Sequence, residues 1–199
     1  MLGVAFGLGS IPTSNIAARR RADVDLRDVG SGTVSGTNLF RVAGFAPLAV
    51  TGILDIAKGA TGPLLAGRDR PVLAAFAGGA AIAGHNWSPA LRGAGGRGFA
   101  PALGAIGVQA WPGVPLLLGG LVAGKAAKQT GLGGFVAQCA LVPLLARTHG
   151  ARGAFAGACV VAPMWLKRLA GNRPPEAPSA RVYVHRLLFD HDADDEEAA

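Results

Sequence analysis

The chain contains 199 residues, of which 50% are hydrophobic and only 16% are charged, and its mean hydropathy is +0.37. Soluble domains carry about 25% charged residues and disordered chains lack long apolar runs, so this composition excludes both classes and indicates an all-α polytopic membrane protein. The net charge is +7, and the basic residues fall in loops between apolar segments, which argues against a nucleic-acid partner and favours membrane lipids and phosphorylated substrates.

The apolar runs predict about seven transmembrane helices, several of them shorter than the ~20 residues that span a bilayer core. The first run begins at Met1 without a positively charged leader region, so we expect a retained helix and not a cleaved signal peptide. One later stretch permits either one long helix or two short ones, because Pro112 removes a helical donor and Gly113 adds backbone freedom. The seven predicted segments are 1–18, 45–66, 71–88, 99–110, 111–124, 131–147 and 152–167.

The distribution of positive charge decides between these alternatives, because cytoplasmic loops of membrane proteins carry an excess of Lys and Arg. With seven segments and the 19–44 loop inside, 14 of the 19 basic residues are cytoplasmic and four are external, whereas one long helix over 99–124 places nine on each side. We therefore predict seven helices, with the glycine-rich loops and the C-terminus in the cytoplasm. Residues 1–170 are expected to form the membrane domain and residues 171–199 a cytoplasmic tail, whose acidic end (190–197) is expected to be disordered.

The first glycine-rich stretch, residues 30–38, combines glycines with hydroxyl and amide side chains and is followed by an arginine. Glycines allow successive backbone N–H groups to point at one anion, and a guanidinium can bind a phosphate through two hydrogen bonds. The alternative is a flexible loop whose arginines only satisfy the charge asymmetry across the membrane. The candidate binding residues of this stretch are Gly30, Ser31, Gly32, Thr37, Asn38 and Arg41.

The second glycine-rich stretch, residues 93–98, precedes an apolar segment, and its candidate phosphate-binding residues are Gly95, Gly96, Arg97 and Gly98. The N-terminus of a helix attracts anions through its unpaired N–H groups and its dipole, and Arg97 adds a full positive charge. His85, at the end of the preceding segment, is either a ligand or acid–base group of the same site or an interfacial residue with structural hydrogen bonds. This stretch is the second candidate phosphate site.

Asp55 and Lys58 lie inside an apolar segment and, three residues apart, share one face of the predicted helix. Ionisable groups in a membrane segment are costly and often mark a functional site. The alternative is a self-neutralising pair that holds neighbouring helices together.

The remaining reactive side chains predict neither a metal site nor a cofactor. The four histidines are scattered along the chain, which fits no zinc-binding pattern. Cys139 and Cys159 lie within apolar segments and are expected to be free thiols. Because no Ser-His-Asp arrangement can be assembled, any chemistry must rely on positioning and charge stabilisation.

Several short motifs, in their order and spacing, resemble the bacterial membrane glycerol-3-phosphate acyltransferases that use acyl phosphate as donor, the PlsY family. The resemblance is clear over residues 8–110 and rests on hydropathy beyond them. The motifs are Gly9-Ser10-Ile11-Pro12-Thr13, Asp25-Leu26-Arg27-Asp28-Val29-Gly30-Ser31-Gly32, Gly36-Thr37-Asn38-x-x-Arg41, Asp55-x-x-Lys58-Gly59, Gly84-His85-x-x-x-Pro89 and Gly95-Gly96-Arg97-Gly98.

The resemblance implies a seven-helix enzyme of the bacterial inner membrane whose active site faces the cytoplasm. Such an enzyme transfers a fatty acyl group from acyl phosphate to the sn-1 hydroxyl of glycerol 3-phosphate, releasing lysophosphatidic acid and phosphate for phospholipid biosynthesis. It also implies catalytic roles for Ser31, Arg41 and Arg97. The implied substrate-binding and phosphate-binding residues are Gly30, Gly32, Thr37, Asn38, Lys58, His85, Gly95, Gly96 and Gly98.

The chain departs from the family pattern, which makes it a divergent member. Thr33 replaces an Asn, Ser35 replaces a Gly, and Arg97 replaces a Lys, which keeps the charge but changes the geometry. The third family motif, His-Arg-x-x-Asn-Ile, has no clear counterpart, although residues 164–171 keep a basic pair followed by Leu and Gly, and His185 lies further on. The alternative function is therefore a non-catalytic homologue that binds or transports a phosphorylated or lipid ligand.

Overall fold

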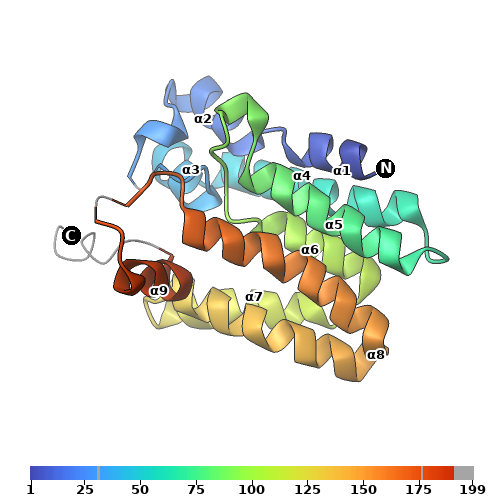
Figure 1. Cartoon of the computed structure of the whole chain (residues 1–199). Helices are drawn as coiled ribbons and strands as arrows, with labels where there is room; N and C mark the ends of the chain where they lie inside the picture. The colour runs from blue at the N-terminus through green and yellow to red at the C-terminus, as the bar shows by residue number, and fades with distance from the viewer. Residues whose placement is uncertain (31, 176, 191–199) are drawn as a thin grey trace.

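The computed structural model describes residues 1–30, 32–175 and 177–190, and every regular element in these residues is a helix. The all-α prediction is thus confirmed over this part of the chain. Figure 1 shows the elements in chain order. They are α1 (Leu2–Gly9), α2 (Thr13–Ala22), η1 (Leu26–Asp28), α3 (Gly36–Ala43), α4 (Phe45–Ala66), α5 (Pro71–Asn86), η2 (Pro89–Leu91), α6 (Phe99–Gln109), α7 (Gly113–Ala126), α8 (Thr130–Ala170) and α9 (Ala180–Phe189).

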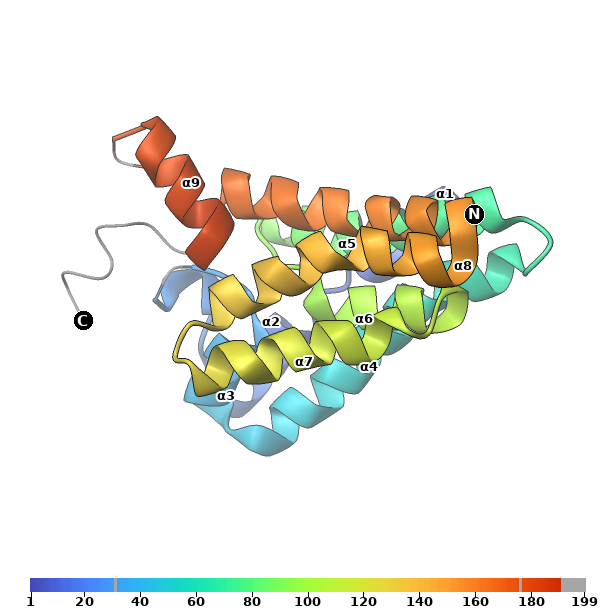
Figure 2. The same cartoon turned by 90° about the horizontal axis from the view of Figure 1, so that it is seen from below.

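Helices α4 to α8 run along a common direction and form a bundle, against which α1 packs through α5 and α4 (Figures 1 and 2). Helices α2, α3 and α9 gather at one end of this bundle, together with the connections that follow α5, α7 and α8. The opposite end carries the α4–α5 and α6–α7 turns and the reversal within α8. The helical hairpins therefore bring both glycine-rich stretches to the same end, as the charge distribution predicts.

The ambiguous stretch 99–124 forms two short antiparallel helices, α6 and α7, which confirms the two-helix interpretation (Figure 2). Residues Ala110, Trp111 and Pro112 separate them. At ~1.5 Å per residue, α6 and α7 are about 16 and 21 Å long, shorter than the ~30 Å hydrocarbon core. By length and composition, α4 and α8 are the two described helices that could each cross a membrane.

One predicted segment is wrong, whereas the predicted break between the last two segments is confirmed. Residues 1–18 do not form one helix, because α1 ends at Gly9 and α2 begins only after Pro12, which has no backbone N–H to continue the ladder. Segments 131–147 and 152–167 are the two halves of α8, which reverse direction at Gly150, where φ is 63° and ψ is −153° (Figure 1).

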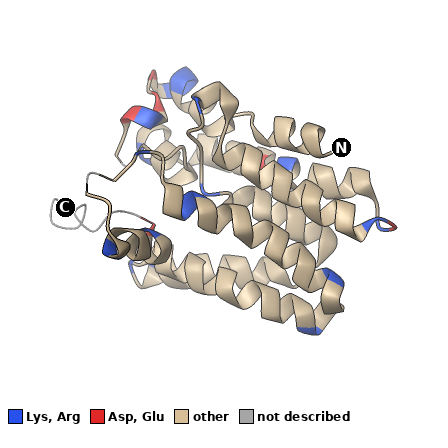
Figure 3. Cartoon of the chain, viewed as in Figure 1, with Lys and Arg blue, Asp and Glu red and all other residues tan. Residues whose placement is uncertain are grey.

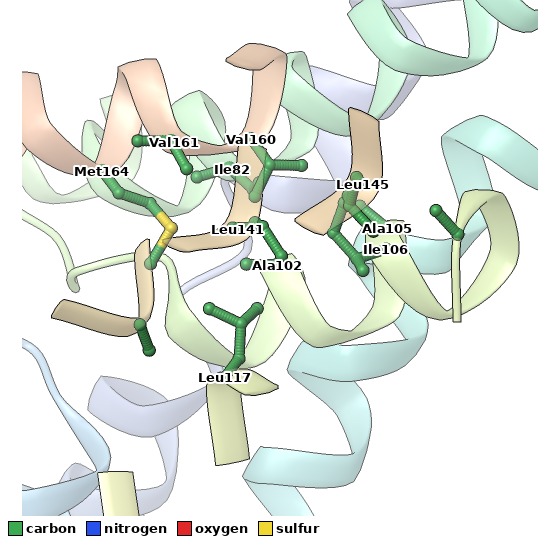
Figure 4. Close-up of a cluster of buried hydrophobic side chains, with 12 residues drawn as sticks. Ile82, Ala102, Ala105, Ile106, Leu117, Leu141, Leu145, Val160, Val161 and Met164 are labelled. Carbon is green, nitrogen blue, oxygen red and sulfur yellow. The ribbon is translucent and has the colours of Figure 1, made fainter. Parts of the chain in front are cut away.

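The main hydrophobic core lies between α5, α6, α7 and α8, where aliphatic side chains such as Ile82, Ile106 and Leu141 are fully buried (Figure 4). Small residues allow the helices to approach closely. A Cβ on Gly59 of α4 would lie only 1.9 Å from the carbonyl oxygen of Pro101 in α6. Such backbone contacts are typical of membrane helices, whose association depends on close packing.

The outward face of α4 is apolar over its length. Phe45, Ile53 and Leu64 expose 71%, 68% and 64% of their surface, respectively. A contiguous exposed apolar face of this kind suits contact with lipid hydrocarbon and not with water. Charged residues instead collect near the two ends of the bundle, with the Asp55–Lys58 pair as an internal exception (Figure 3).

Candidate active site

The two glycine-rich stretches contact each other directly at the end of the bundle where α2, α3 and α9 gather. The backbone N–H of Val34 donates a hydrogen bond to the carbonyl oxygen of Gly95 (3.2 Å), and Gly95 and Gly96 are both buried. A Cβ on Gly96 would lie 3.0 Å from the carbonyl oxygen of Val34. The close approach of the two loops therefore depends on a glycine at this position.

Asn172, which follows α8, joins the two loops through one side-chain amide. Its Nδ2 donates to the carbonyl oxygens of Gly32 (3.2 Å) and Gly95 (2.9 Å), while its Oδ1 accepts from the backbone N–H of Gly95 (3.1 Å). The sequence analysis did not single out Asn172. Its only signal was a position just after the last apolar segment, on the side predicted to carry positive charge.

The first loop is shaped by Asn38 from within. The Nδ2 of Asn38 donates to the carbonyl oxygens of Thr33 (2.9 Å) and Val29 (3.5 Å), and the residue is 4% exposed. Ser35 caps α3, because its Oγ accepts from the backbone N–H of Asn38 (3.3 Å). Asn38 therefore orders the loop from the inside, and its Nδ2 is taken up by these bonds to backbone oxygens.

A pocket of about 300 Å³ opens beside these loops. Its size is at the lower limit for small-molecule sites, which begin at ~300 Å³. Among the described residues that line it, four are cationic and none is acidic. Together these charges make the pocket suited to a small anion. The lining residues are Arg27, Gly32, Trp87, Leu91, Arg92, Gly93, Ala94, Lys167, Gly171, Asn172 and Arg173.

Arg27 is held at the pocket by Asp25. Its Nε and Nη2 donate to the two carboxylate oxygens at 3.0 and 2.7 Å, and Arg19 also pairs with this carboxylate. The hydrogen bond from Arg27 holds the pKa of Asp25 well below its usual range, and the same bond raises the pKa of Arg27. Arg173 donates to the carbonyl oxygen of Arg27 (2.9 Å), which ties the segment after α8 to this arginine.

Arg97 does not line the pocket, and its side chain instead lies among Thr33, Lys167 and Asp190. Its Nη1 donates to the carbonyl oxygen of Lys167 (2.8 Å) and its Nη2 lies 3.5 Å from Thr33 Oγ1. Its Nε forms an ion pair with Asp190 at the end of α9 (2.7 Å). The second predicted phosphate ligand is thus bonded to both the first loop and the C-terminal helix.

Asp55 and Lys58 form a buried cluster with Thr13 on the inner side of the loops. Lys58 Nζ donates to Asp55 Oδ1 (2.7 Å), to Thr13 Oγ1 (3.1 Å) and to the carbonyl oxygen of Ile11 (2.6 Å). These bonds tie α4 to the break between α1 and α2. His85 Nδ1 lies 3.8 Å from Asp55, and a Cβ on Gly96 would lie 2.2 Å from His85 Nε2, so His85 packs between this cluster and the second loop.

The predicted site residues thus occupy different places. Arg41 and Thr37 are exposed on α3 and line neither the cationic pocket nor a smaller pocket beside Gly95 and Gly96. Gly98, with φ of 75°, caps the start of α6. Gly30 is exposed, with φ of 53°. Ser31 and the acidic end of the chain, residues 191–199, lie outside the described residues.

Comparisons with known proteins identify the family. Residues 1–172 match the model of the family described as Glycerol-3-phosphate acyltransferase. A glycerol-3-phosphate acyltransferase of Synechococcus sp. (strain CC9902) is 35% identical over 186 residues, covering 87% of this chain and 92% of that relative. A second, from Shouchella clausii (strain KSM-K16), is 40% identical over 126 residues, and the alignment spans 60% of each chain.

The fold also has counterparts among solved structures. The crystal structure of PlsY, an integral membrane glycerol 3-phosphate acyltransferase, in its glycerol 3-phosphate form superposes with a TM-score of 0.78 at 24% identity, covering 99% of this chain and 96% of that chain. Its lysophosphatidic acid form gives a TM-score of 0.76 at 22% identity. With the sequence matches and the paired glycine loops, these findings show that the chain is an integral membrane protein and belongs to the glycerol-3-phosphate acyltransferase family.

Proposed function

We propose that this protein transfers a fatty acyl group from acyl phosphate to the sn-1 hydroxyl of glycerol 3-phosphate, forming lysophosphatidic acid and phosphate. The observation that carries the proposal is the cationic pocket of about 300 Å³, formed in a member of this family where its two glycine loops meet. Both substrates carry a phosphate group, and the described lining of the pocket holds four cations and no acid. The family relatives that support this assignment are themselves named glycerol-3-phosphate acyltransferases.

In the proposed reaction the acceptor hydroxyl attacks the carbonyl carbon of acyl phosphate, and the phosphate leaves with the electrons of the broken C–O bond. A substrate phosphate oxygen takes the hydroxyl proton, since the lining residues in the described part of the chain include no carboxylate or histidine to act as a base. Backbone N–H groups and fixed cations stabilise the charge that develops on the carbonyl and phosphate oxygens.

The roles of individual residues are part of this proposal. We assign Ser31, Arg41 and Arg97 to catalysis. Their support is the motif match for all three, together with the contact between Arg97 and the first loop. The residues assigned to binding or shaping the phosphate sites are Gly30, Gly32, Thr37, Asn38, Lys58, His85, Gly95, Gly96 and Gly98.

The assay that tests the activity uses the purified chain in lipid vesicles with palmitoyl phosphate and glycerol 3-phosphate, and scores phosphate release. We expect release that depends on both the protein and the acceptor. A folded protein that binds glycerol 3-phosphate without any turnover above background would instead be the non-catalytic homologue. That alternative is favoured by the altered third motif, where Trp165 and Lys167 lie in a segment without the His and Asn of the family.

We also propose that the protein lies in the bacterial inner membrane with the pocket and the C-terminus facing the cytoplasm. The support is the excess of Lys and Arg at the pocket end of the bundle (Figure 3). The test uses single cysteines at Arg68 and Lys125, which are exposed at opposite ends, in a background without Cys139 and Cys159. A membrane-impermeant maleimide added to spheroplasts should label position 68 only, and labelling of position 125 only would reverse the orientation.

A further inference from the structure

Lys167 is a buried cation that faces the pocket. Its side chain lies near the end of α8 and is only 1% exposed, yet it lines the pocket together with Gly93 and Trp87. Its Nζ donates to the carbonyl oxygen of Gly93 (3.2 Å) and lies 5.3 Å from the centre of the Trp87 ring. An ammonium group carries three N–H donors, so two of them have no acceptor among the described residues.

Other buried or half-buried cations at this end of the bundle have partners for their charge or for their N–H donors. Lys58 pairs with Asp55 at 2.7 Å, and Arg97 pairs with Asp190 at 2.7 Å. Arg168 donates three hydrogen bonds to carbonyl oxygens near the end of α9 and at the start of α8. For Lys167, no carboxylate of the described residues lies within ion-pair distance.

A buried charge without an anionic partner is destabilising, because one carbonyl oxygen and an aromatic ring replace only part of the hydration that Lys167 loses. Nearby positive charge adds to this cost, since Arg92 and Arg173 line the same pocket and Arg97 contacts the carbonyl oxygen of Lys167 (2.8 Å). A bound dianion would supply acceptors for the two remaining N–H groups and a countercharge for Lys167. The pocket beside Lys167 is therefore complementary to a bound anion.

We propose that Lys167 is a direct ligand of a phosphate monoester bound in this pocket. Lys167 lies in the segment that corresponds to the third family motif, whose His and Asn have no clear counterparts in this chain. The proposal rests on the proposed function, because it names the residue that holds the phosphate of one of its ligands. The shared chemistry is a terminal phosphate, which belongs both to glycerol 3-phosphate and to the lipid product lysophosphatidic acid.

The test measures thermal unfolding and ligand affinity of the full chain in detergent, with glycerol 3-phosphate, lysophosphatidic acid and, as an uncharged control, glycerol. Lys167→Met keeps the length of the side chain and removes its charge. We expect this variant without ligand to unfold at the same temperature as wild type or higher, and its Kd for the phosphate monoester to rise by about 10- to 100-fold. Lys125→Met, an exposed site near the same end, is the matched control and should leave the Kd unchanged.

A second variant separates ligand binding from a merely structural role. Lys167→Gln keeps a donor for the carbonyl oxygen of Gly93 but has no charge, so it should lose affinity as Lys167→Met does. A structural role predicts the opposite pattern, in which both variants lower the unfolding temperature and bind the ligand like wild type. Unchanged Kd values in both variants would overturn the proposal, as would a wild-type chain that binds none of these phosphate monoesters.

The ligand that loses affinity identifies the source of the phosphate. A loss for glycerol 3-phosphate places the soluble acceptor in the pocket, whereas a loss for lysophosphatidic acid alone places the lipid phosphate there. The proposed acyl transfer fails separately: a wild-type chain without turnover that still binds glycerol 3-phosphate through Lys167 would retain the site and lose the reaction.

Discussion

Gly95→Ala tests whether the contact between the two loops creates the site. A Cβ at this position would lie 2.3 Å from the carbonyl oxygens of both His85 and Asn86. These are backbone atoms at the end of α5, so they cannot turn away as a flexible side chain would. Because carbon contacts are optimal near 3.5 Å, the loop has to move by about 1 Å.

The displacement would break the bonds that hold the loops together. Gly95 accepts from Val34 N (3.2 Å) and Asn172 Nδ2 (2.9 Å) and donates to Asn172 Oδ1 (3.1 Å). At about 1 kcal/mol for each hydrogen bond, their loss costs about 3 kcal/mol in local stability. A misplacement of about 1 Å at a positioning site can lower the rate by ~100-fold, so we expect kcat/KM to fall by about that factor.

The assay is phosphate release in vesicles, with the unfolding temperature measured in parallel to exclude global unfolding. Gly107→Ala in α6 is the matched control, because the nearest heavy atom to its Cβ would be Val114 Cγ2 at 3.7 Å, an ordinary contact. This control should keep kcat/KM within about twofold of wild type. If Gly95→Ala behaved like Gly107→Ala, the joined loops would not form the active site.

Three further predictions concern other contacts of the site. Asn172→Asp keeps the acceptor for the N–H of Gly95 but places a carboxylate against two carbonyl oxygens. Steady-state kinetics should therefore show that the KM for glycerol 3-phosphate rises by about tenfold. An unchanged KM would argue against the role of Asn172 in joining the two loops. Arg97→Ala should abolish phosphate release while Arg97→Lys retains part of it, because Lys keeps the charge without the forked geometry, and full activity of the alanine variant would remove Arg97 from the mechanism. The pKa of Asp25 is lowered by Arg27, so this pair stabilises the fold above about pH 4 and its contribution is lost as the pH falls below that. The difference in unfolding temperature between wild type and Asp25→Asn should be constant from pH 7 to about pH 4.5 and shrink below it. A difference that does not depend on pH would contradict this linkage.

Much of the architecture follows from local features of the chain. The apolar runs predicted the helices, because an apolar segment in lipid must satisfy its backbone N–H and C=O groups by hydrogen bonds within the segment. Pro112 and the charge asymmetry together indicated that 99–124 is two helices, as α6 and α7 confirm. The motifs around residues 30–38 and 95–98 identified the family, because several weak patterns in fixed order are specific together. The local pattern was misleading at residues 1–18, where Pro12 interrupts a run that hydropathy alone reads as continuous.

Which residues line the pocket depends instead on contacts between parts of the chain that are distant in sequence. Asn172 bonds to Gly32 and Gly95, which lie 140 and 77 positions away in the sequence. Lys167 faces the pocket only because the second half of α8 returns beside α5 after the reversal at Gly150. Arg41, by contrast, carries a family motif and lies exposed outside the pocket. Periodicity and composition describe what each segment prefers by itself, whereas a cationic pocket is made by the packing that brings separate helix ends together.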